Sequence, residues 1–250
     1  LGLKMIRRAN SIGHHYFIAN LTSKDIASSV ALAVNEKHGI WYNPMTGEYH
    51  EAIIGDKGIQ LNLKSGESRI LITSNKPVNE WKLGSKVKVG GKEAIAAADS
   101  KTIDLTENAW KLSFTEDAPK VGETFNLKGV KSWEGLSDKA KVMMGTGVYE
   151  TTIKLSKDDA KKQWTIDLGD VRESARVYIN NKYVGCAWAV PYILNCKDAL
   201  NKGKNTLRIE VTNLPANRIA ELDRQGVKWR KMKDNIRSAE RFSRNAETDL

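Results

Sequence analysis

Trp188 and Tyr192 are the side chains best suited by type and spacing to bind a small polar ligand. They stand close together in the segment GCAWAVPY, residues 185–192. An exposed aromatic ring stacks on the C–H face of a pyranose, so the pair predicts a carbohydrate contact. The alternative is that Trp188 fills a hydrophobic core and Tyr192 packs beneath Pro191, the commoner use of such residues between strands.

A second candidate group is Asn213, Asn217 and Arg218, which follow a strand-like run in the segment VTNLPANR. An Asn after a strand commonly caps exposed backbone groups. An Arg can pair with a carboxylate or touch a sugar hydroxyl. We therefore carry these residues as candidate carbohydrate contacts beside a purely structural role.

Three acidic residues, Asp167, Asp170 and Glu173, cluster around Gly169. Glycoside hydrolysis needs two carboxylates that flank one bond on a rigid scaffold. An Asp beside a Gly is, however, a common turn former. The pattern predicts a turn, and we expect no catalytic residue in this chain.

Metal and redox motifs are weak. Adjacent residues of a strand point to opposite faces, so His14 and His15 cannot readily share an ion, and no Cys or carboxylate stands at ligand spacing. Cys186 and Cys196 lie ten positions apart without a CxxC motif. We expect two buried free thiols, with a disulfide as the alternative in an oxidising compartment. We predict no metal site and no cofactor.

The candidate residues are embedded in runs that alternate apolar and polar side chains, which predicts strands with one buried and one wet face. The expected strands are 15–20, 28–34, 58–63, 69–73, 148–155, 164–168, 175–179 and 206–211. Asn180 and Asn181 tolerate positive φ and predict a hairpin turn. From 216 to the end of the chain, apolar residues recur at spacings close to helical, interrupted at Gly226; they are Ile219, Leu222, Trp229, Met232, Ile236 and Phe242.

Three segments together resemble a known family: GTGVYETTIKL (145–155), WTIDLGDVRESARVYINNKYVGCAWAVPYIL (164–194) and DALNKGKNTLRIEVTNLPANR (198–218). They resemble the galactose-binding-like jelly roll of large glycoside hydrolases. The pattern is similar to the sugar-binding domain of family 2, and closer to the C-terminal region of family 106 α-L-rhamnosidase-like enzymes. The segment LNLKSGESRILIT (61–73) resembles the short β-sandwich that follows the catalytic barrel in such proteins.

The resemblance implies an all-β chain: a small β-sandwich at 1–75, a linker at 76–103 and a galactose-binding-like jelly-roll β-sandwich at 104–235. Residues 236–250 depart from the family pattern, and we expect a short helical or disordered tail. Jelly rolls of this type often hold a structural calcium ion, for which Asp104 or Asp198 could serve.

Composition narrows the possible partners. The 250 residues carry a formal net charge of +10. Their lysines are scattered rather than gathered in a basic stripe, so we expect no nucleic-acid partner. The sequence contains no run of 18 apolar residues, so it predicts no membrane span. The chain opens without Met or a signal peptide, and we expect a fragment of a longer protein.

These features predict a non-catalytic accessory region of a secreted or periplasmic glycoside hydrolase that acts on plant or microbial polysaccharide. The resemblance implies an α-L-rhamnosidase-like parent, with carbohydrate and the catalytic domain of the same polypeptide as partners. Two alternatives stay open: an autonomous carbohydrate-binding module, and a structural spacer without a ligand.

Overall fold

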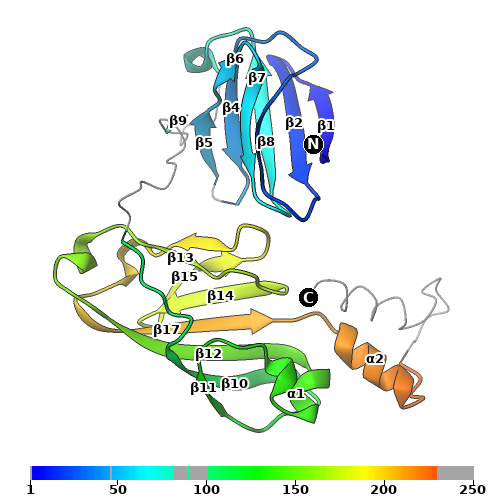
Figure 1. Cartoon of the computed structure of the whole chain (residues 1–250), viewed down its shortest axis with the longest axis vertical. Coiled ribbons are helices and arrows are strands. Elements are labelled where there is room, and N and C mark those ends of the chain that lie inside the picture. The colour runs from blue at the N-terminus through cyan, green and yellow to red at the C-terminus, as the bar shows by residue number, and fades with distance from the viewer. Residues whose placement is uncertain (1, 46, 82–88, 91–100, 230–250) are drawn as a thin grey trace. The chain divides into compact units, whose positions relative to one another are not determined.

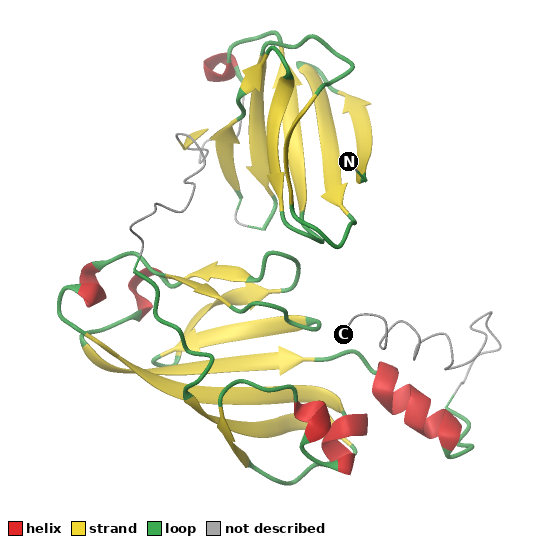
Figure 2. Ribbon diagram, viewed as in Figure 1, coloured by secondary structure: helices red, strands yellow, loops and turns green. Residues whose placement is uncertain are grey.

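The computed structural model describes residues 2–45, 47–81, 89–90 and 101–229. The chain divides into two units, Leu1–Thr102 and Ile103–Leu250. Strands form most of the regular structure in both (Figure 2), which confirms the predicted all-β class. No helix in the described part of the chain is long and apolar enough to cross a membrane.

The first unit is a sandwich of two sheets. A six-stranded sheet has the order β1-β2-β8-β4-β5-β9, and a three-stranded sheet has the order β3-β7-β6. Figure 1 shows the larger sheet with β1 at one edge. The strands are β1 (Leu3–Ala9), β2 (Gly13–Asn20), β3 (Ile26–Val30), β4 (His38–Asn43), β5 (Glu48–Glu51), β6 (Ile54–Gly55), β7 (Gly58–Leu63), β8 (Ser68–Ser74) and β9 (Val89–Gly90).

The core of the first unit follows from the alternation of its strands. On β7, Ile59, Leu61 and Leu63 are buried while the residues between them are exposed or half-buried. They pack with Tyr16 of β2 and Trp41 of β4, so the inner faces of the two sheets share one hydrophobic cluster. Burial of this apolar area is the main stabilising contribution to the unit.

The second unit has one six-stranded antiparallel sheet in the order β11-β10-β12-β17-β14-β15, and a two-stranded sheet of β13 and β16. Two short helices, α1 (Asp138–Val142) and α2 (Ala216–Arg224), accompany them. The strands are β10 (Ala109–Ala118), β11 (Phe125–Lys128), β12 (Met144–Leu155), β13 (Thr165–Asp167), β14 (Ser174–Ile179), β15 (Lys182–Ala187), β16 (Ile193–Asn195) and β17 (Gly203–Thr212).

One face of the larger sheet is covered. Its inward residues, such as Leu112, Tyr149 and Val177, pack with Trp133 from a connecting segment and with Leu194 of β16. The opposite face carries exposed polar side chains along β10 and β12. A sheet with one buried and one wet face is what the alternation predicts.

Local rules account for the turns. Asn180 and Asn181 adopt φ values of 52° and 64°, and Ile179 pairs with Lys182, so the predicted hairpin is confirmed. Helix α2 lies where the helical spacing predicts it and ends before Gly226, whose φ is +67°. Helix α1 has no counterpart in the sequence predictions; Ser137 caps it by accepting a hydrogen bond from the Ala140 amide.

The predicted strands are confirmed with small differences in their ends. The range 58–63 coincides with β7. The range 28–34 is wrong at both ends, since β3 spans Ile26–Val30 and stops where its pairing with β7 stops. The predicted tail at 236–250 lies outside the described residues.

Candidate functional site

Of the five predicted carbohydrate-contact residues, Trp188 and Asn213 directly follow strands of the six-stranded sheet at the same end, which we call the rim, while Tyr192, Asn217 and Arg218 lie farther along the two connections. Ala175 at the start of β14 pairs with Ala187 on one side and with Val211 on the other. Trp188 follows Ala187, and Asn213 follows β17. Because neighbouring strands are about 4.8 Å apart, the backbones at these two positions are separated by roughly 10 Å.

Trp188 lies on the surface of the rim. It is 63% exposed, so it does not fill the core. The chain then passes through the cis peptide Val190–Pro191 to Tyr192, whose carbonyl oxygen accepts a hydrogen bond from the Leu168 amide at 3.0 Å. This bond ties the Trp188–Tyr192 segment to the neighbouring acidic turn.

Tyr192 is half-buried beside that turn. Burial raises the pKa of its phenol, and the charges of Glu173 and Asp170 raise it further, while Arg172 acts in the opposite direction. Tyr192 is therefore a neutral hydroxyl at ordinary pH, able to donate and accept a hydrogen bond. The rim thus combines an exposed indole, a phenol and a charged turn, which is a suitable chemical set for a sugar.

Asn213 has a structural position. Its Oδ1 accepts from the Gly145 amide at 2.9 Å, and its Nδ2 donates to the Met143 carbonyl at 3.0 Å. Its own amide donates to the Gly145 carbonyl at 3.2 Å. Both polar atoms of the side chain are used to join the end of β17 to the start of β12.

Asn217 and Arg218 lie on helix α2. Asn217 Nδ2 donates to Glu134 Oε1 at 2.8 Å in an exposed position. Arg218 is half-buried, and no ion pair of its guanidinium is found among the described residues. Of the two, Arg218 keeps more hydrogen-bonding capacity for a ligand.

The acidic turn is organised by its own carboxylates. Asp167 Oδ1 accepts from the Gly169 amide at 2.9 Å, as a turn-forming Asp does. Asp170 pairs with Arg172, with Oδ2 2.8 Å from Nη2. These contacts support the prediction of a turn rather than a catalytic pair.

The histidines and cysteines have separate surroundings. His14 Nδ1 lies 2.8 Å from Glu36 Oε1, while His15 contacts Asn10. Both cysteines are free thiols, but only Cys196 is fully buried, and burial raises its pKa to about 11. Within the described ranges, no group of three or more His, Cys, Asp or Glu side chains could hold a metal ion. A calcium ion at Asp104 or Asp198 stays a prediction.

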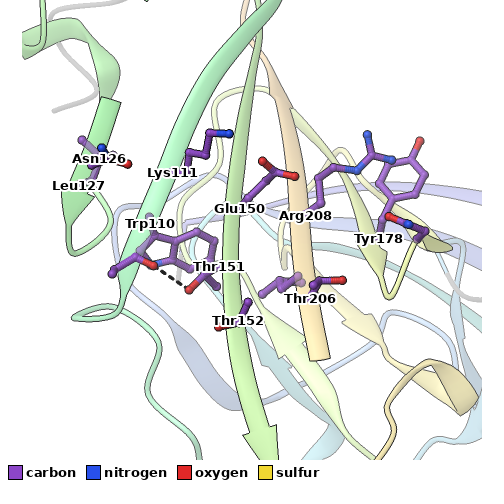
Figure 3. A pocket seen from close by; sticks show the side chains of 13 residues that line it. Trp110, Lys111, Asn126, Leu127, Glu150, Thr151, Thr152, Tyr178, Thr206 and Arg208 are labelled. Carbon is purple, nitrogen blue, oxygen red and sulfur yellow. Dashed lines mark hydrogen bonds between the residues drawn. The ribbon is translucent and has the colours of Figure 1, made fainter. Parts of the chain in front are cut away.

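A feature that the sequence does not reveal crosses the exposed face of the larger sheet. One residue from each of the six strands pairs with the next, and together they form what we call the cross-strand row. In order across the sheet, it is Asn126, Lys111, Glu150, Arg208, Tyr178 and Tyr183. Figure 3 shows Lys111, Glu150, Arg208 and Tyr178 pointing to the same side of the sheet.

A hollow of about 510 Å³ lies along this row. Its lining includes the shorter side chains Thr152 and Thr206, which stand opposite each other on β12 and β17. They lie two residues along β12 and β17 from Glu150 and Arg208, on the same face of the sheet, and their short side chains leave space beside the row. The volume falls within the range of small-ligand sites.

The first unit also has an exposed face with an unusual composition. Ile6, Phe17, Ile70, Tyr42 and Tyr49 pair successively across five strands. Phe17 is 45% exposed and Ile6 is 60% exposed, whereas the neighbouring Tyr16 points into the core. The other three members are half-buried, so the exposed apolar part of the row lies on β1 and β2; an exposed apolar patch commonly marks an interaction surface.

Comparison with known proteins finds a similarity for most of the second unit. Residues 137–249 match a family model described as glycosyl hydrolase 2 galactose-binding domain-like. This part of the chain is therefore similar to the galactose-binding-like domains that the model describes. The sequence-based resemblance is thereby confirmed at the level of the domain.

Two relatives extend the similarity. A curated protein of Formosa agariphila, provisionally named a beta-glucuronidase, is 28% identical over 196 residues, which are 71% of this chain and 17% of that protein. The structure of a rhamnosidase from Novosphingobium sp. PP1Y matches 94% of this chain and 22% of its own, with a TM-score of 0.65 and 21% identity. The latter shows a shared fold. The chain spans about a fifth of the length of these two proteins.

Proposed function

We propose that this chain is a non-catalytic accessory region of a secreted or periplasmic glycoside hydrolase, and that its galactose-binding-like domain holds glycan at the rim. The observation that supports a binding role is the exposure of Trp188 beside the charged turn and Tyr192. Because the indole is 63% exposed, most of its surface is not packed in the core. The exposed ring offers a stacking face to a sugar.

The proposed parent is an α-L-rhamnosidase-like enzyme. The motif resemblance and the rhamnosidase fold match support that assignment, while the name of the Formosa agariphila relative supports a β-glucuronidase parent. The two agree on a glycoside hydrolase and differ in the sugar. We take the rhamnosidase as the first assignment because its structure matches nearly the whole of this chain.

The accessory role needs a partner domain, and the apolar row of the first unit offers a surface for one. Ile6 and Phe17 expose large apolar side chains on the face away from the core. In the proposal, the catalytic domain of the same polypeptide covers this face. Burial of the row would stabilise the contact through the hydrophobic effect.

A direct test uses the purified 250-residue chain with aryl α-L-rhamnoside and aryl β-D-glucuronide as substrates. We expect no turnover of either. Turnover that is lost when Asp170 and Glu173 are replaced by Asn and Gln would contradict the accessory role.

Binding is tested separately, by calorimetry with rhamnose-containing oligosaccharides. We expect affinity that falls at least about fivefold in Trp188→Ala, because a stacking aromatic contributes about 1 kcal/mol or more. Phe17→Ala removes another exposed aromatic, from the first unit, and serves as the control. Binding by the isolated chain would favour the autonomous module over the spacer.

A further inference from the structure

Lys111 and Glu150 are an unusual pair on the exposed face of the second unit. They stand directly opposite each other on β10 and β12, and both are exposed. Opposite charges in this position commonly form a cross-strand ion pair. Within the described part of the chain, neither side chain has a recorded hydrogen bond or ion pair. An ammonium and a carboxylate therefore stand side by side with their hydrogen-bonding capacity unused.

The next two members of the cross-strand row are held in place. The Arg208 guanidinium lies over the ring of Tyr178, 4.0 Å from its centroid. Arg208 Nη1 also donates to Glu210 Oε1 at 2.6 Å. These contacts fix a planar, amphipathic wall beside the free Lys111 and Glu150, at one side of the hollow.

We propose that this hollow is a second carbohydrate site, which takes a neutral oligosaccharide lying across the strands. Two adjacent sugar hydroxyls would bridge Lys111 and Glu150, one accepting from the ammonium and the other donating to the carboxylate. The ring of Tyr178 and the Asn126 amide lie farther along the same row. The six strands extend this row over roughly 24 Å, enough for several sugar units.

The charge pattern favours a neutral ligand. Lys111 and Arg208 are cationic, but Glu150 stands between them and Glu210 pairs with Arg208. A carboxylate or phosphate on the ligand would approach these two acidic side chains and be repelled. Hydroxyl groups use both signs of charge without that penalty. Phosphate-rich polymers also depend on clustered cations, which this row does not present.

The hollow is separate from the rim. Arg208 precedes the end of β17 at Thr212 by four residues, and Tyr178 follows the start of β14 at Ser174 by four. At about 3.3 Å per residue, the two surfaces are roughly 13 Å apart along the strands. The second site is therefore independent of Trp188 and goes beyond the rim function proposed above.

The experiment is calorimetric titration of the full 250-residue chain with three neutral probes, cellohexaose, xylohexaose and β-1,4-galactohexaose, and with hexagalacturonate as the acidic comparator. We expect at least one neutral probe to bind with a Kd below about 1 mM. Lys111→Ala and Glu150→Ala should each weaken it about tenfold, because a hydrogen bond to a charged group is lost. Trp188→Ala removes the rim contact and serves to distinguish binding at the rim from binding in the hollow.

Lys154→Ala is the matched control, since it removes an exposed lysine of β12 outside the hollow. Thermal unfolding of every variant confirms that the fold is kept. The proposal is overturned if no neutral probe binds, or if Lys111→Ala and Glu150→Ala bind like the unmodified chain. If binding is lost only in Trp188→Ala, the rim site is supported and the proposal of a site in the hollow is overturned. The two proposals can therefore fail separately.

Discussion

Arg208 covers the ring of Tyr178, and its guanidinium carbon lies 4.0 Å from the ring centroid. The two residues are paired on β17 and β14, so the sheet register itself sets this contact. Glu210, two residues along β17, accepts a hydrogen bond from the same guanidinium at 2.6 Å. The central part of the exposed face is therefore a fixed surface rather than a set of independent long side chains.

A double-mutant cycle measures this contact. Arg208→Met and Tyr178→Leu each remove one partner, and we expect a coupling energy of about 0.5–1 kcal/mol, the usual value for a cation–π pair at a partly exposed site. The measurement is the free energy of unfolding in urea for the two single variants and the double variant. Strict additivity of the single effects would show that the contact contributes nothing.

Asn213 and Asn217 differ in what their side-chain amides bind, so their replacement should affect stability differently. Asn213→Ala leaves the Gly145 amide and the Met143 carbonyl without their partners, so we expect a loss of about 2–3 kcal/mol in the free energy of unfolding. Asn217→Ala breaks one exposed bond to Glu134 and should cost less than about 1 kcal/mol. Equal effects of the two replacements in urea unfolding would contradict the structural role of Asn213.

Gly147 tests the packing of the core against β12. A Cβ at this position would lie 2.5 Å from the ring of Trp133, so we expect Gly147→Ala to destabilise the domain by about 1–3 kcal/mol. Gly135 has no neighbouring atom within 4 Å of such a Cβ, which makes Gly135→Ala the matched control. Thermal unfolding distinguishes the two, and an unchanged Tm for Gly147→Ala would be inconsistent with this packing.

The sequence predicts the strands well because alternation is local. Each inward residue of β7 is apolar and each hairpin residue at 180–181 tolerates positive φ, so both features are read directly from neighbours in the chain. The exposure of Trp188 is different. An indole between apolar residues is expected to be buried, and only the position of the β15–β16 connection places it outside the core.

The cross-strand row could not be predicted for a related reason. Lys111, Glu150, Arg208 and Tyr178 lie on strands that are distant in sequence, and their juxtaposition depends on strand order and register. In the sequence, each of these residues occupies an ordinary solvent-facing position of its strand. The helix α1 was missed because five residues carry too little periodicity to predict a helix.

Tyr149 should make the free energy of unfolding fall at alkaline pH. Burial raises the pKa of its phenol from 10.0 to about 12. Because the folded state keeps a proton that the unfolded chain releases, the stabilisation is complete below pH 10 and is lost as the pH rises toward 12. The corresponding loss is at most about 3 kcal/mol.

Urea unfolding at pH values on both sides of this range measures the effect. Tyr149→Phe should lack this decrease, at a cost of about 1 kcal/mol at neutral pH from the lost hydrogen bond to the Lys131 carbonyl. Tyr183→Phe alters an exposed phenol and should keep the decrease. A pH dependence that is identical in Tyr149→Phe and the unmodified chain would contradict the assignment.

The most direct test of the account is an NMR titration that follows the indole N–H resonance of Trp188, assigned by its loss in Trp188→Phe. On addition of a rhamnose-containing oligosaccharide, we predict that this resonance shifts with saturation while the indole resonances of the buried Trp41 and Trp110 stay in place. A Trp188 resonance that does not move at saturating glycan would contradict the proposed rim site.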